Sequence, residues 1–419
     1  MRSLFTLMST VSFFLLAFHL QGQNEWEPTG PANITIHSLA VKMPYLFAGA
    51  NCNEGGIFLT DDYGDSWDQV NQGLPQDQAP IRSIAINDTS FIVGATYRGM
   101  YMATDATEIW QKIPNGNAVY SIAFASAPWD AIVVAGSKIK GTSAVIISYD
   151  GINWNDISGG LPVEGALYSI LVRDTSLFVS TGHGVYRYNI HSSQWKPSNI
   201  GMTNAFVDAL AQHESYLYAG TNEKGVFISE DGSTWTEKNN GLQIDDTEFT
   251  SFAFSGTGIF AAASGDHGGV FQSNDNGDTW HEINTGFPAG VNINALAVNG
   301  LYLYAGSDSN GVYRRELSSL VSTHDLDEDF AGSHLLIYPN PGSGNFNLSF
   351  SSDPASAEFK NIEVICYTPL GQSIFIKGYK LVNGELNTDL DISNFPEGMY
   401  LLQIRNQNKS VFRKIIIHK

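Results

Sequence analysis

The sequence predicts an all-β protein: a seven-bladed β-propeller followed by a small immunoglobulin-like antiparallel β-sandwich. Three observations predict it. A short β-run recurs seven times, at intervals between 38 and 48 residues. The 419 residues include 41 glycines and 8 tryptophans, a composition typical of short strands joined by tight turns. The last 85 residues break the repeat and consist of alternating apolar runs between Gly and Pro turns.

The first 22 residues have the pattern of a secretory signal peptide and are expected to be removed. One positive charge at Arg2 precedes an apolar run over residues 4–18, and Gly22 provides a small residue before the cleavage point. The apolar run is shorter than a membrane-spanning helix requires. No later segment is apolar enough to cross a bilayer, so we expect no transmembrane segment in the mature protein.

Residues 23–317 contain the repeat that predicts the propeller. The first strand of each unit has an apolar residue at its centre: Leu39, Ile84, Ile122, Ile170, Leu210, Phe252 and Leu296. A second strand ends in small residues, as in Phe47-Ala48-Gly49, and a third begins with glycine, as in Gly56-Ile57-Phe58. A turn and a tryptophan then open a fourth strand. Four short strands per unit of about 40–45 residues predict one blade per unit.

The turn before the fourth strand resembles the Asp-box of bacterial-neuraminidase-type (BNR) repeats, Ser/Thr-x-Asp-x-Gly-x-Thr-Trp. Two units match it in full and two match a version one residue shorter; their main residues are Asp62 and Trp67, Asp275 and Trp280, Asp150 and Trp154, and Asp231 and Trp235. We expect a structural role, in which the carboxylate accepts turn N–H groups and the tryptophan packs into the blade. A calcium loop is disfavoured because the spacing lacks a distal bidentate glutamate, so we predict no metal and no cofactor.

The two ends of the repeat region predict how the ring closes. The seventh unit, which ends near Glu316, lacks a tryptophan strand, whereas the mature N-terminus carries one without a blade, at Trp26-Glu27-Pro28. We therefore predict that this N-terminal segment supplies the outer strand of the last blade, beside Gly311–Glu316. Such closure removes exposed strand edges.

The C-terminal part of the chain predicts a linker and a sorting domain. Residues 318–334 are acidic and aperiodic, as expected of a linker, and residues 335–419 predict the β-sandwich. The order of motifs in this tail is similar to the type A C-terminal sorting domain of the type IX secretion system: Tyr338-Pro339-Asn340-Pro341, Leu370-Gly371-Gln372, Pro396-Glu397-Gly398-Met399-Tyr400 and a basic, apolar C-terminus.

This resemblance implies how the protein is exported and where it is located. The type IX secretion machinery would be a partner, and the protein would be secreted or held on the outer cell surface of a Gram-negative bacterium. The resemblance also implies that the tail can be removed, with either release or attachment to surface lipopolysaccharide.

Charge and cysteine content limit the partners and the stabilising chemistry. The chain has 22 basic and 42 acidic residues, a net charge of −20. The tail carries +1 and the linker −4, so about −17 lies on residues 1–317. Such a surface repels a phosphate backbone, and we predict no nucleic-acid partner. Cys52 and Cys366 fall in different predicted domains, and Cys366 is expected to be a core thiol.

The repeat resembles Asp-box propellers broadly, among them sialidases, sortilin-type receptors, xyloglucan-degrading hydrolases and photosystem II assembly factor-like propellers. A loop of the type Asn-x-Gly-Leu-Pro follows the tryptophan strand, as in Asn71-Gln72-Gly73-Leu74-Pro75. This arrangement is most similar to the assembly factor and exo-xyloglucanase-type group. These proteins share a fold and not a chemistry, so the repeat does not decide function. A sialidase is disfavoured, because the segment nearest to that family's Phe/Tyr-Arg-Ile-Pro is Ile81-Arg82-Ser83-Ile84.

We predict that the propeller is a non-enzymatic binding module for a glycan or a protein. Candidate binding residues lie in loops that share one face of the ring: Arg98, Trp129, Lys138, Lys140 and His183. The alternative is a polysaccharide-active glycoside hydrolase, which needs two carboxylates about 5–10 Å apart. Its candidates are the loop acids Asp245, Asp246 and Glu248, opposite Asp266. Acidic loops on so acidic a chain are more often solvated surface, which favours binding.

Overall fold

The computed structural model of the chain describes residues 25–42, 45–51, 55–75, 77, 79–87, 91–95, 98–104, 109–113, 119–125, 131–139, 142–162, 167–202, 206–256, 258–300, 302–317, 334–338, 342–351, 361–367, 373–381, 385–396, 398–405 and 410–417. This part of the chain forms 35 strands and no α-helix, which confirms the all-β prediction. None of its segments is a helix that could span a membrane. The predicted signal peptide and, except for His334, the predicted linker lie outside the described residues.

Each of the first six predicted repeat units contains four consecutive strands in the described residues. Unit 1 contains β2 (Ile36–Lys42), β3 (Tyr45–Ala50), β4 (Ile57–Thr60) and β5 (Asp68–Gln69). Unit 2 contains β6 (Ile81–Ile86), β7 (Phe91–Ala95), β8 (Gly99–Ala103) and β9 (Gln111–Ile113). Unit 3 contains β10 (Ser121–Ala125), β11 (Ala131–Ile139), β12 (Thr142–Ser148) and β13 (Asn155–Asp156). Unit 4 contains β14 (Leu167–Arg173), β15 (Ser176–Thr181), β16 (Gly184–Asn189) and β17 (Gln194–Pro197).

The later units follow the same order, except that the last one takes a strand from the N-terminus. Unit 5 contains β18 (Phe206–His213), β19 (Tyr216–Asn222), β20 (Val226–Ser229) and β21 (Thr236–Glu237). Unit 6 contains β22 (Thr247–Ser255), β23 (Gly258–Gly265), β24 (Gly269–Ser273) and β25 (His281–Glu282). The last unit contains β26 (Ile293–Asn299), β27 (Tyr302–Ser307), β28 (Gly311–Glu316) and β1 (Glu27–Pro28).

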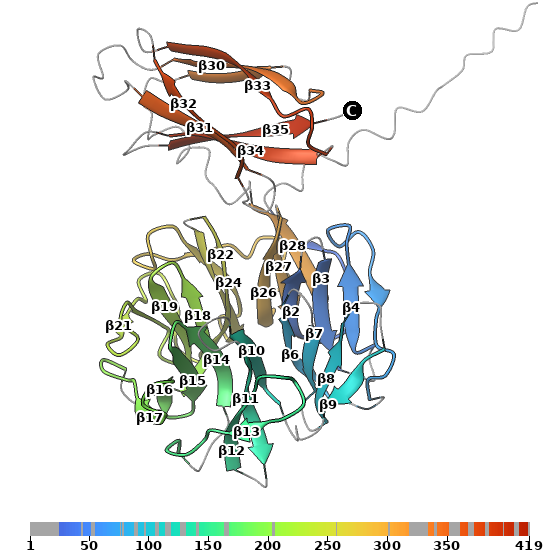
Figure 1. Cartoon of the computed structure of the whole chain (residues 1–419), viewed down its shortest axis with the longest axis vertical. Helices are drawn as coiled ribbons and strands as arrows, with labels where there is room; N and C mark the ends of the chain where they lie inside the picture. The colour runs from blue at the N-terminus through green and yellow to red at the C-terminus, as the bar shows by residue number, and fades with distance from the viewer. Residues whose placement is uncertain are drawn as a thin grey trace, which may run out of the picture.

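The first strands of the units lie around a common axis, and the other strands radiate outwards (Figure 1). Each first strand contacts the first strand of the next unit, and β26 contacts β2 in turn. Units 5 and 6 are joined further by a single pair of facing residues, Asn222 and Glu248. The apolar residues that define the repeat therefore pack between neighbouring units, in several separate clusters rather than one core.

A serine in the first strand links most units to the next one. Its hydroxyl bonds to the backbone of the following first strand, in the pairs Ser38 Oγ to Ile81 O (2.8 Å), Ile122 N to Ser83 Oγ (2.9 Å), Ile170 N to Ser121 Oγ (3.1 Å), Leu210 N to Ser169 Oγ (3.2 Å) and Leu296 N to Ser251 Oγ (3.0 Å). Units 5 and 7 have alanine here, at Ala209 and Ala295. The small residue of the repeat thus serves a contact between units.

The repeated tryptophans form a second set of links between units, which we call the indole clips. Six indole N–H groups donate to the unit before their own: Trp67 Nε1 to Thr29 Oγ1 (3.3 Å), Trp110 Nε1 to Val70 O (2.5 Å), Trp195 Nε1 to Ile157 O (2.6 Å), Trp235 Nε1 to Ser198 O (2.7 Å), Trp280 Nε1 to Lys238 O (3.0 Å) and Trp26 Nε1 to Ile283 O (2.7 Å). In the described residues, the Trp154 indole N–H has no partner.

The glycine of the Asn-x-Gly-Leu-Pro loop is required by the same contact. In Asn71-Gln72-Gly73-Leu74-Pro75, Gly73 has φ +94°, and a Cβ there would lie 2.3 Å from Trp110 O. The loop therefore lies directly against the tryptophan of the next unit, where only glycine fits.

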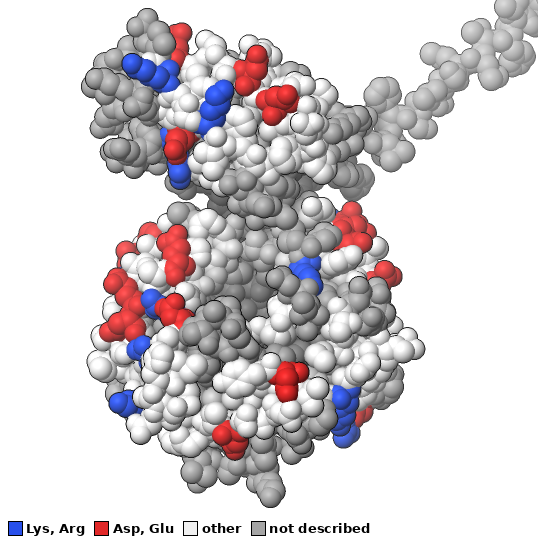
Figure 2. All heavy atoms as spheres, viewed as in Figure 1, with Lys and Arg blue, Asp and Glu red and all other residues white. Residues whose placement is uncertain are grey.

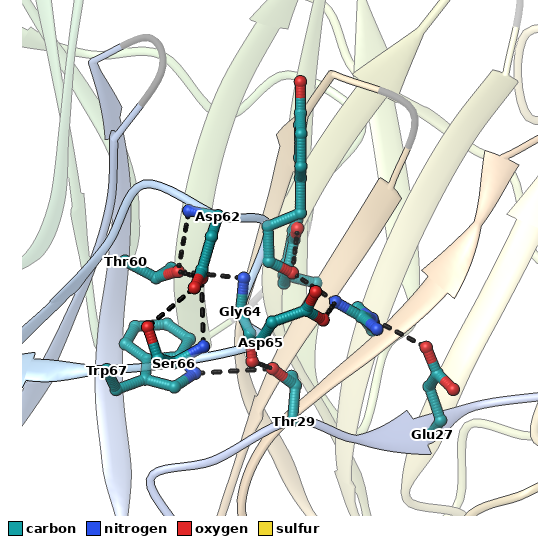
Figure 3. Close-up of polar contacts among 11 residues, drawn as sticks. Glu27, Thr29, Thr60, Asp62, Gly64, Asp65, Ser66 and Trp67 are labelled. Atoms are coloured by element: carbon teal, nitrogen blue, oxygen red, sulfur yellow. Dashed lines mark hydrogen bonds and ion pairs between the residues drawn. The ribbon is translucent and has the colours of Figure 1, made fainter. Parts of the chain in front are cut away.

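The predicted closure of the repeat region is confirmed. β1 pairs antiparallel with β28, with Glu27 facing Arg314 and Pro28 facing Tyr313. Arg314 Nε donates to Glu27 Oε1 (2.6 Å), and its NH1 donates to Asp65 Oδ1 and to Tyr63 O (both 2.7 Å). Figure 3 shows Glu27 and Asp65, the two carboxylates that accept these bonds from Arg314. One side chain thus joins the N-terminal strand, the last unit and the first unit.

The C-terminal part forms two antiparallel sheets in the described residues. One contains β29 (His334–Tyr338), β30 (Asn345–Ser351) and β33 (Glu385–Asp391); the other contains β31 (Asn361–Tyr367), β32 (Ser373–Lys380), β34 (Gly398–Arg405) and β35 (Ser410–Ile417). Side chains from both sheets share one core, which includes Phe346, Leu390 and Leu402. Cys366 lies fully buried in this core as a free thiol, as predicted, and burial raises the pKa of its thiol to about 12.

Candidate functional site

One repeat position, directly before the small residue of the first strand, differs in chemistry from unit to unit. We call it the axial position; its residues are His37, Arg82, Tyr120, Tyr168, Asp208, Thr250 and Asn294. In six of the units the pairing of first and second strands shifts by one residue at or next to this position. Such a bulge inserts an extra residue and redirects its side chain. The fold therefore presents a ring of variable side chains on the strands nearest the axis.

Asp208 is the member of this ring with the most unusual environment. Its Oδ2 atom is buried and has no hydrogen-bond partner in the described residues. Burial, and then the charge of Glu248, raise the pKa of the Asp208 carboxyl to about 8. At pH 7 this carboxyl is therefore mostly protonated, next to a second acid on the neighbouring first strand.

Glu248 is positioned by the contact between units 5 and 6. It faces Asn222 across the single pairing between β19 and β22, and Asn222 Nδ2 donates to Glu248 Oε1 (3.0 Å). A backbone bond from Glu223 N to Thr247 O (2.9 Å) supports the same junction. The two units are thus fixed to each other at the point where the two acids lie.

An aromatic pair lies beside the acids. The rings of Tyr168 and Phe206 are 4.7 Å apart between centroids and tilted by 48°. Burial, together with Asp208 and Glu248, raises the pKa of the Tyr168 phenol, while Arg82 opposes this shift. The phenol is therefore held in its protonated form, which is the opposite of what a phenolate nucleophile needs. We call Tyr168, Phe206, Asp208, Asn222 and Glu248 the axial site.

The other loop acids predicted for a hydrolase lie close together on one unit. Asp245, Asp246 and Asp266 are exposed, in the turns that flank β22 and β23. Asp266 N donates to Asp246 O (3.1 Å), so the turns of Asp246 and Asp266 are direct neighbours. A pairing of these acids would lie along one sheet and not across the axis. Of the four candidates, Glu248 is the one that belongs to the axial site.

The predicted binding residues lie apart from the axial site or outside the described residues. Arg98 is exposed and pairs with Asp77 before the first strand of unit 2, and His183 is exposed in the turn between β15 and β16. Lys138 lies on β11, but its side chain is outside the described part of the structure. Trp129 and Lys140 lie outside the described residues altogether. The axial site contains none of these five side chains.

The Asp-box turns share one hydrogen-bond pattern (Figure 3). Ser66 N donates to Asp62 Oδ1 (3.0 Å), Ser66 Oγ donates to Asp62 Oδ2 (2.6 Å), and Gly64 N donates to Thr60 Oγ1 (2.8 Å). These bonds from Ser66 lower the pKa of the Asp62 carboxyl to about 2.

The three other Asp-boxes follow the same scheme. The carboxylates of Asp150, Asp231 and Asp275 accept the backbone N–H of Asn153, Thr234 and Thr279 at 2.7, 2.7 and 2.9 Å. The carboxylates are occupied by their own turns, and their structural role stays a prediction. Among the described residues, no group of three or more His, Cys, Asp or Glu side chains could hold a metal ion.

Comparison with known proteins identifies the C-terminal part. Residues 336–418 match the family model of the secretion system C-terminal sorting domain. The predicted sorting domain is thereby confirmed, and it indicates export by the type IX secretion machinery. No curated protein matches the sequence of the chain.

Solved structures identify the fold of the repeat region as a β-propeller. YCF48 bound to D1 peptide has a TM-score of 0.54 and 16% identity, over 70% of this chain and 97% of that one. The extracellular domain of BT4673 from B. thetaiotaomicron has a TM-score of 0.57 and 14% identity, over 80% of this chain and 46% of that one. The WD40 propeller domain of Doa1 has a TM-score of 0.54 and 12% identity, over 70% and 98%. At these identities the likeness concerns the fold alone.

The sequence pattern could have pointed to Asp208. Aligning the seven units places an acid at a position where the other units have His, Arg, Tyr, Thr or Asn. The alignment does not reveal that the side chain is buried or that Glu248 is its neighbour, because both depend on the packing of two units.

Proposed function

We propose that the protein is an exported, seven-bladed binding propeller whose ligand contacts the axial site. The observation that carries this proposal is the buried, unpaired Oδ2 of Asp208 beside Glu248. A buried polar atom without a partner is costly, and a ligand that supplies the missing partner gains that free energy on binding. The sorting domain, for which we propose an immunoglobulin-like fold, directs this propeller out of the cell.

The mixture of groups in the axial site supports binding. Two carboxyls, one amide and two aromatic rings offer hydrogen bonds and a stacking surface within one small area. A structure of a similar propeller, YCF48, contains a bound D1 peptide. A propeller of this size therefore accommodates a peptide ligand, and we extend that property to this chain. A glycan remains the other ligand class that the proposal includes.

The second candidate function is a glycoside hydrolase, and one observation favours it. The pKa of the Asp208 carboxyl is raised beside a second carboxyl, Glu248, and an acid with a raised pKa next to another carboxyl can act as a general acid. In that case Asp208 would donate a proton to the leaving group and Glu248 would be the second carboxylate. Asp245, Asp246 and Asp266 would line the rim of such a site.

Binding to glycan and peptide arrays tests the proposal, with the purified mature chain and two variants, Asp208→Asn and Glu248→Gln. We expect at least one ligand to bind the parent chain and to give a signal at least about tenfold lower with both variants. A tenfold loss corresponds to roughly 1.4 kcal/mol of binding free energy. Asp278→Asn is the matched control, since Asp278 lies in an Asp-box turn and pairs with Lys238. Equal binding by all four proteins would refute the axial site.

Product analysis separates the two candidate functions. The same proteins are incubated with a panel of polysaccharides, and released reducing ends are measured. Turnover that disappears in Asp208→Asn and Glu248→Gln would replace the binding proposal by the hydrolase. If turnover is lost only in Asp245→Ala or Asp266→Ala, the catalytic residues lie in the exposed turns of Asp245 and Asp266 and not in the axial site.

The location of the protein is a separate part of the proposal. We propose that the protein leaves the cell through the type IX machinery and is released or attached to surface lipopolysaccharide at the outer surface of a Gram-negative bacterium. Fractionation of cells that express the whole chain, or a chain without residues 336–418, tests it. Retention of the shortened protein inside the cell supports the proposal, and normal export contradicts it.

A further inference from the structure

We infer that the axial site binds a cationic nitrogen group, the ammonium or guanidinium of a basic peptide segment, between the carboxyls of Asp208 and Glu248. This inference rests on the proposed binding function and names the ligand class. Its basis is the way two acids, an amide and two rings are arranged around one unpaired oxygen atom.

The two acids come from different units that are fixed to each other. Asp208 lies on β18 and Glu248 on β22, and these first strands contact each other beside the pairing of Asn222 with Glu248. The acids cannot move apart without breaking the Asn222 Nδ2–Glu248 Oε1 bond and the backbone bond between Glu223 and Thr247. Ionisation of both acids at once is therefore disfavoured in the folded ring.

A cation fits this arrangement. It supplies N–H donors for the unpaired Asp208 Oδ2 and, once Asp208 has lost its proton, it pairs with both carboxylates. A neutral hydroxyl group provides a donor but no charge to offset two ionised carboxylates. A hydrogen bond from a charged donor is about twice as strong as one between neutral groups, which favours the cation further.

The surroundings suit a basic side chain. The Tyr168 and Phe206 rings lie next to the acids, and aromatic faces attract ammonium and guanidinium groups. The whole chain carries a net charge of −20, and Figure 2 shows acidic side chains over the repeat units with fewer basic ones between them. This field draws a basic segment towards the protein and repels an acidic one.

Binding of a cation must be linked to a proton. Glu248 on β22 acts on Asp208, and β19 contributes the uncharged Asn222. Tyr168 on β14 is within electrostatic reach of both acids and of Arg82 on β6. Below the pKa of about 8, Asp208 carries a proton in the free protein. When the cation binds, the Asp208 O–H bond breaks and the proton passes to the buffer, so both carboxylates face the bound positive charge.

Calorimetric titration of the full mature chain tests the inference. The probes are a Gly-Gly-Lys-Gly-Gly peptide with blocked ends, the same peptide with N-acetyl-lysine, its arginine version, and cellohexaose as a neutral glycan. We expect the lysine and arginine peptides to bind, with affinity rising roughly tenfold per pH unit between pH 6 and pH 8. Titration in two buffers of different ionisation enthalpy is expected to reveal release of up to about one proton per peptide at pH 7.

The variants distinguish the axial site from general attraction to an acidic protein. Asp208→Asn and Glu248→Gln are expected to weaken binding at least tenfold, and Asp208→Asn also removes the pH dependence and the proton release. Asp278→Asn removes one negative charge in the turn between β24 and β25, outside the axial site, and is expected to change neither the affinity nor its pH dependence. Equal losses in Asp278→Asn, or equal binding of the acetylated peptide, would overturn the inference.

The remaining outcomes separate the inference from the proposed function. If cellohexaose binds and the basic peptides do not, and Asp208→Asn abolishes the binding of cellohexaose, the inference of a cationic ligand is wrong and the axial binding site is retained. Binding of a basic peptide that both axial variants retain overturns the inference and the axial site together. Thermal unfolding of each variant, followed by tryptophan fluorescence, shows whether the altered chain is folded under the conditions of the titration.

Discussion

At the scale of single residues, the chemistry of the chain is concentrated where a repeated position changes its residue type. The axial position is occupied by seven side chains on equivalent strands, and one of them is an acid whose environment disfavours its charge. Because the fold supplies the bulged position in nearly every unit, the backbone needs no change to place a different group there. Function can therefore vary at this position while the structural repeat stays constant.

Replacement of Asp208 by asparagine is expected to change the pH dependence of stability. The folded chain holds the Asp208 proton up to a pKa of about 8, whereas an unfolded aspartate loses it near pH 4. Stability from this group is therefore complete below pH 4 and is lost as the pH rises towards 8. Asp208→Asn removes this loss and raises the free energy of unfolding at pH 8 by on the order of 1–3 kcal/mol.

Urea unfolding at pH 5 and pH 8 measures this effect. All eight tryptophans precede residue 281 in the sequence, so their fluorescence reports the propeller without a contribution from the sorting domain. Asp266→Asn, an exposed acid on a neighbouring turn, serves as the control and is expected to stay within about 0.5 kcal/mol of the parent at both pH values. Identical pH slopes for Asp208→Asn and the parent chain would contradict the assigned environment.

At the scale of elements, neighbouring units are held together by small, repeated polar contacts as well as by apolar packing. Serine hydroxyls link the first strands, and the indole clips link the outer strands to the unit before them. Backbone carbonyls accept most of the indole bonds, so the side chains of the accepting residues can vary freely. This explains why tryptophan recurs while its partners, such as Ser198 and Lys238, share no chemistry.

Loss of an indole clip is expected to weaken the junction between two units. Trp235→Phe removes the buried bond to Ser198 O and keeps most of the apolar contact, at a cost of about 1 kcal/mol or somewhat more. Trp154→Phe is the matched comparison, because in the described residues the Trp154 indole N–H has no acceptor. We expect the urea-unfolding free energy to fall less in Trp154→Phe. The reverse order would show that apolar packing alone decides the effect.

The strands themselves were predictable, because alternation, turn residues and the period of the repeat are local properties of the sequence. The closing pair β1–β28 was also predictable, since Trp26 repeats a segment that the last unit lacks. The direction of the indole bonds was not, because an acceptor such as Ile157 O belongs to another unit and has no sequence signal. The axial site was missed for the same reason. Glu248 was selected as a loop acid, but the burial of Asp208 and its closeness to Glu248 were recognisable only once two units were placed side by side.

At the scale of the whole molecule, the ring depends on a junction of only two paired residues. β1 contributes Glu27 and Pro28 to the last unit, and much of the junction is held by side chains around them. Trp26 stacks on Phe287 with ring centroids 4.6 Å apart, and Arg314 lies over the Tyr302 ring at 5.1 Å. Arg314 is the central group, because it bonds both to the N-terminal strand and to the turn of the first unit.

Substitution of Arg314 by methionine is expected to lower the free energy of unfolding by about 1–3 kcal/mol. Methionine keeps an apolar stem against Tyr302 but leaves Glu27 and Asp65 without their shared cation. The Arg314 side chain is only 17% exposed, whereas Arg98, the control, is 52% exposed and pairs with Asp77. Arg98→Met is expected to change stability by less than about 0.5 kcal/mol. Similar effects of the two substitutions in urea unfolding would refute a special role for the junction.

The position of the closing strands separates ring closure from the sorting domain along the sequence. The β1–β28 pairing ends at Arg314, whereas the match to the sorting-domain family begins at residue 336. The ring therefore closes without using any residue of the sorting domain. A cut between the two parts would leave the hydrogen bonds of the closing strands in place.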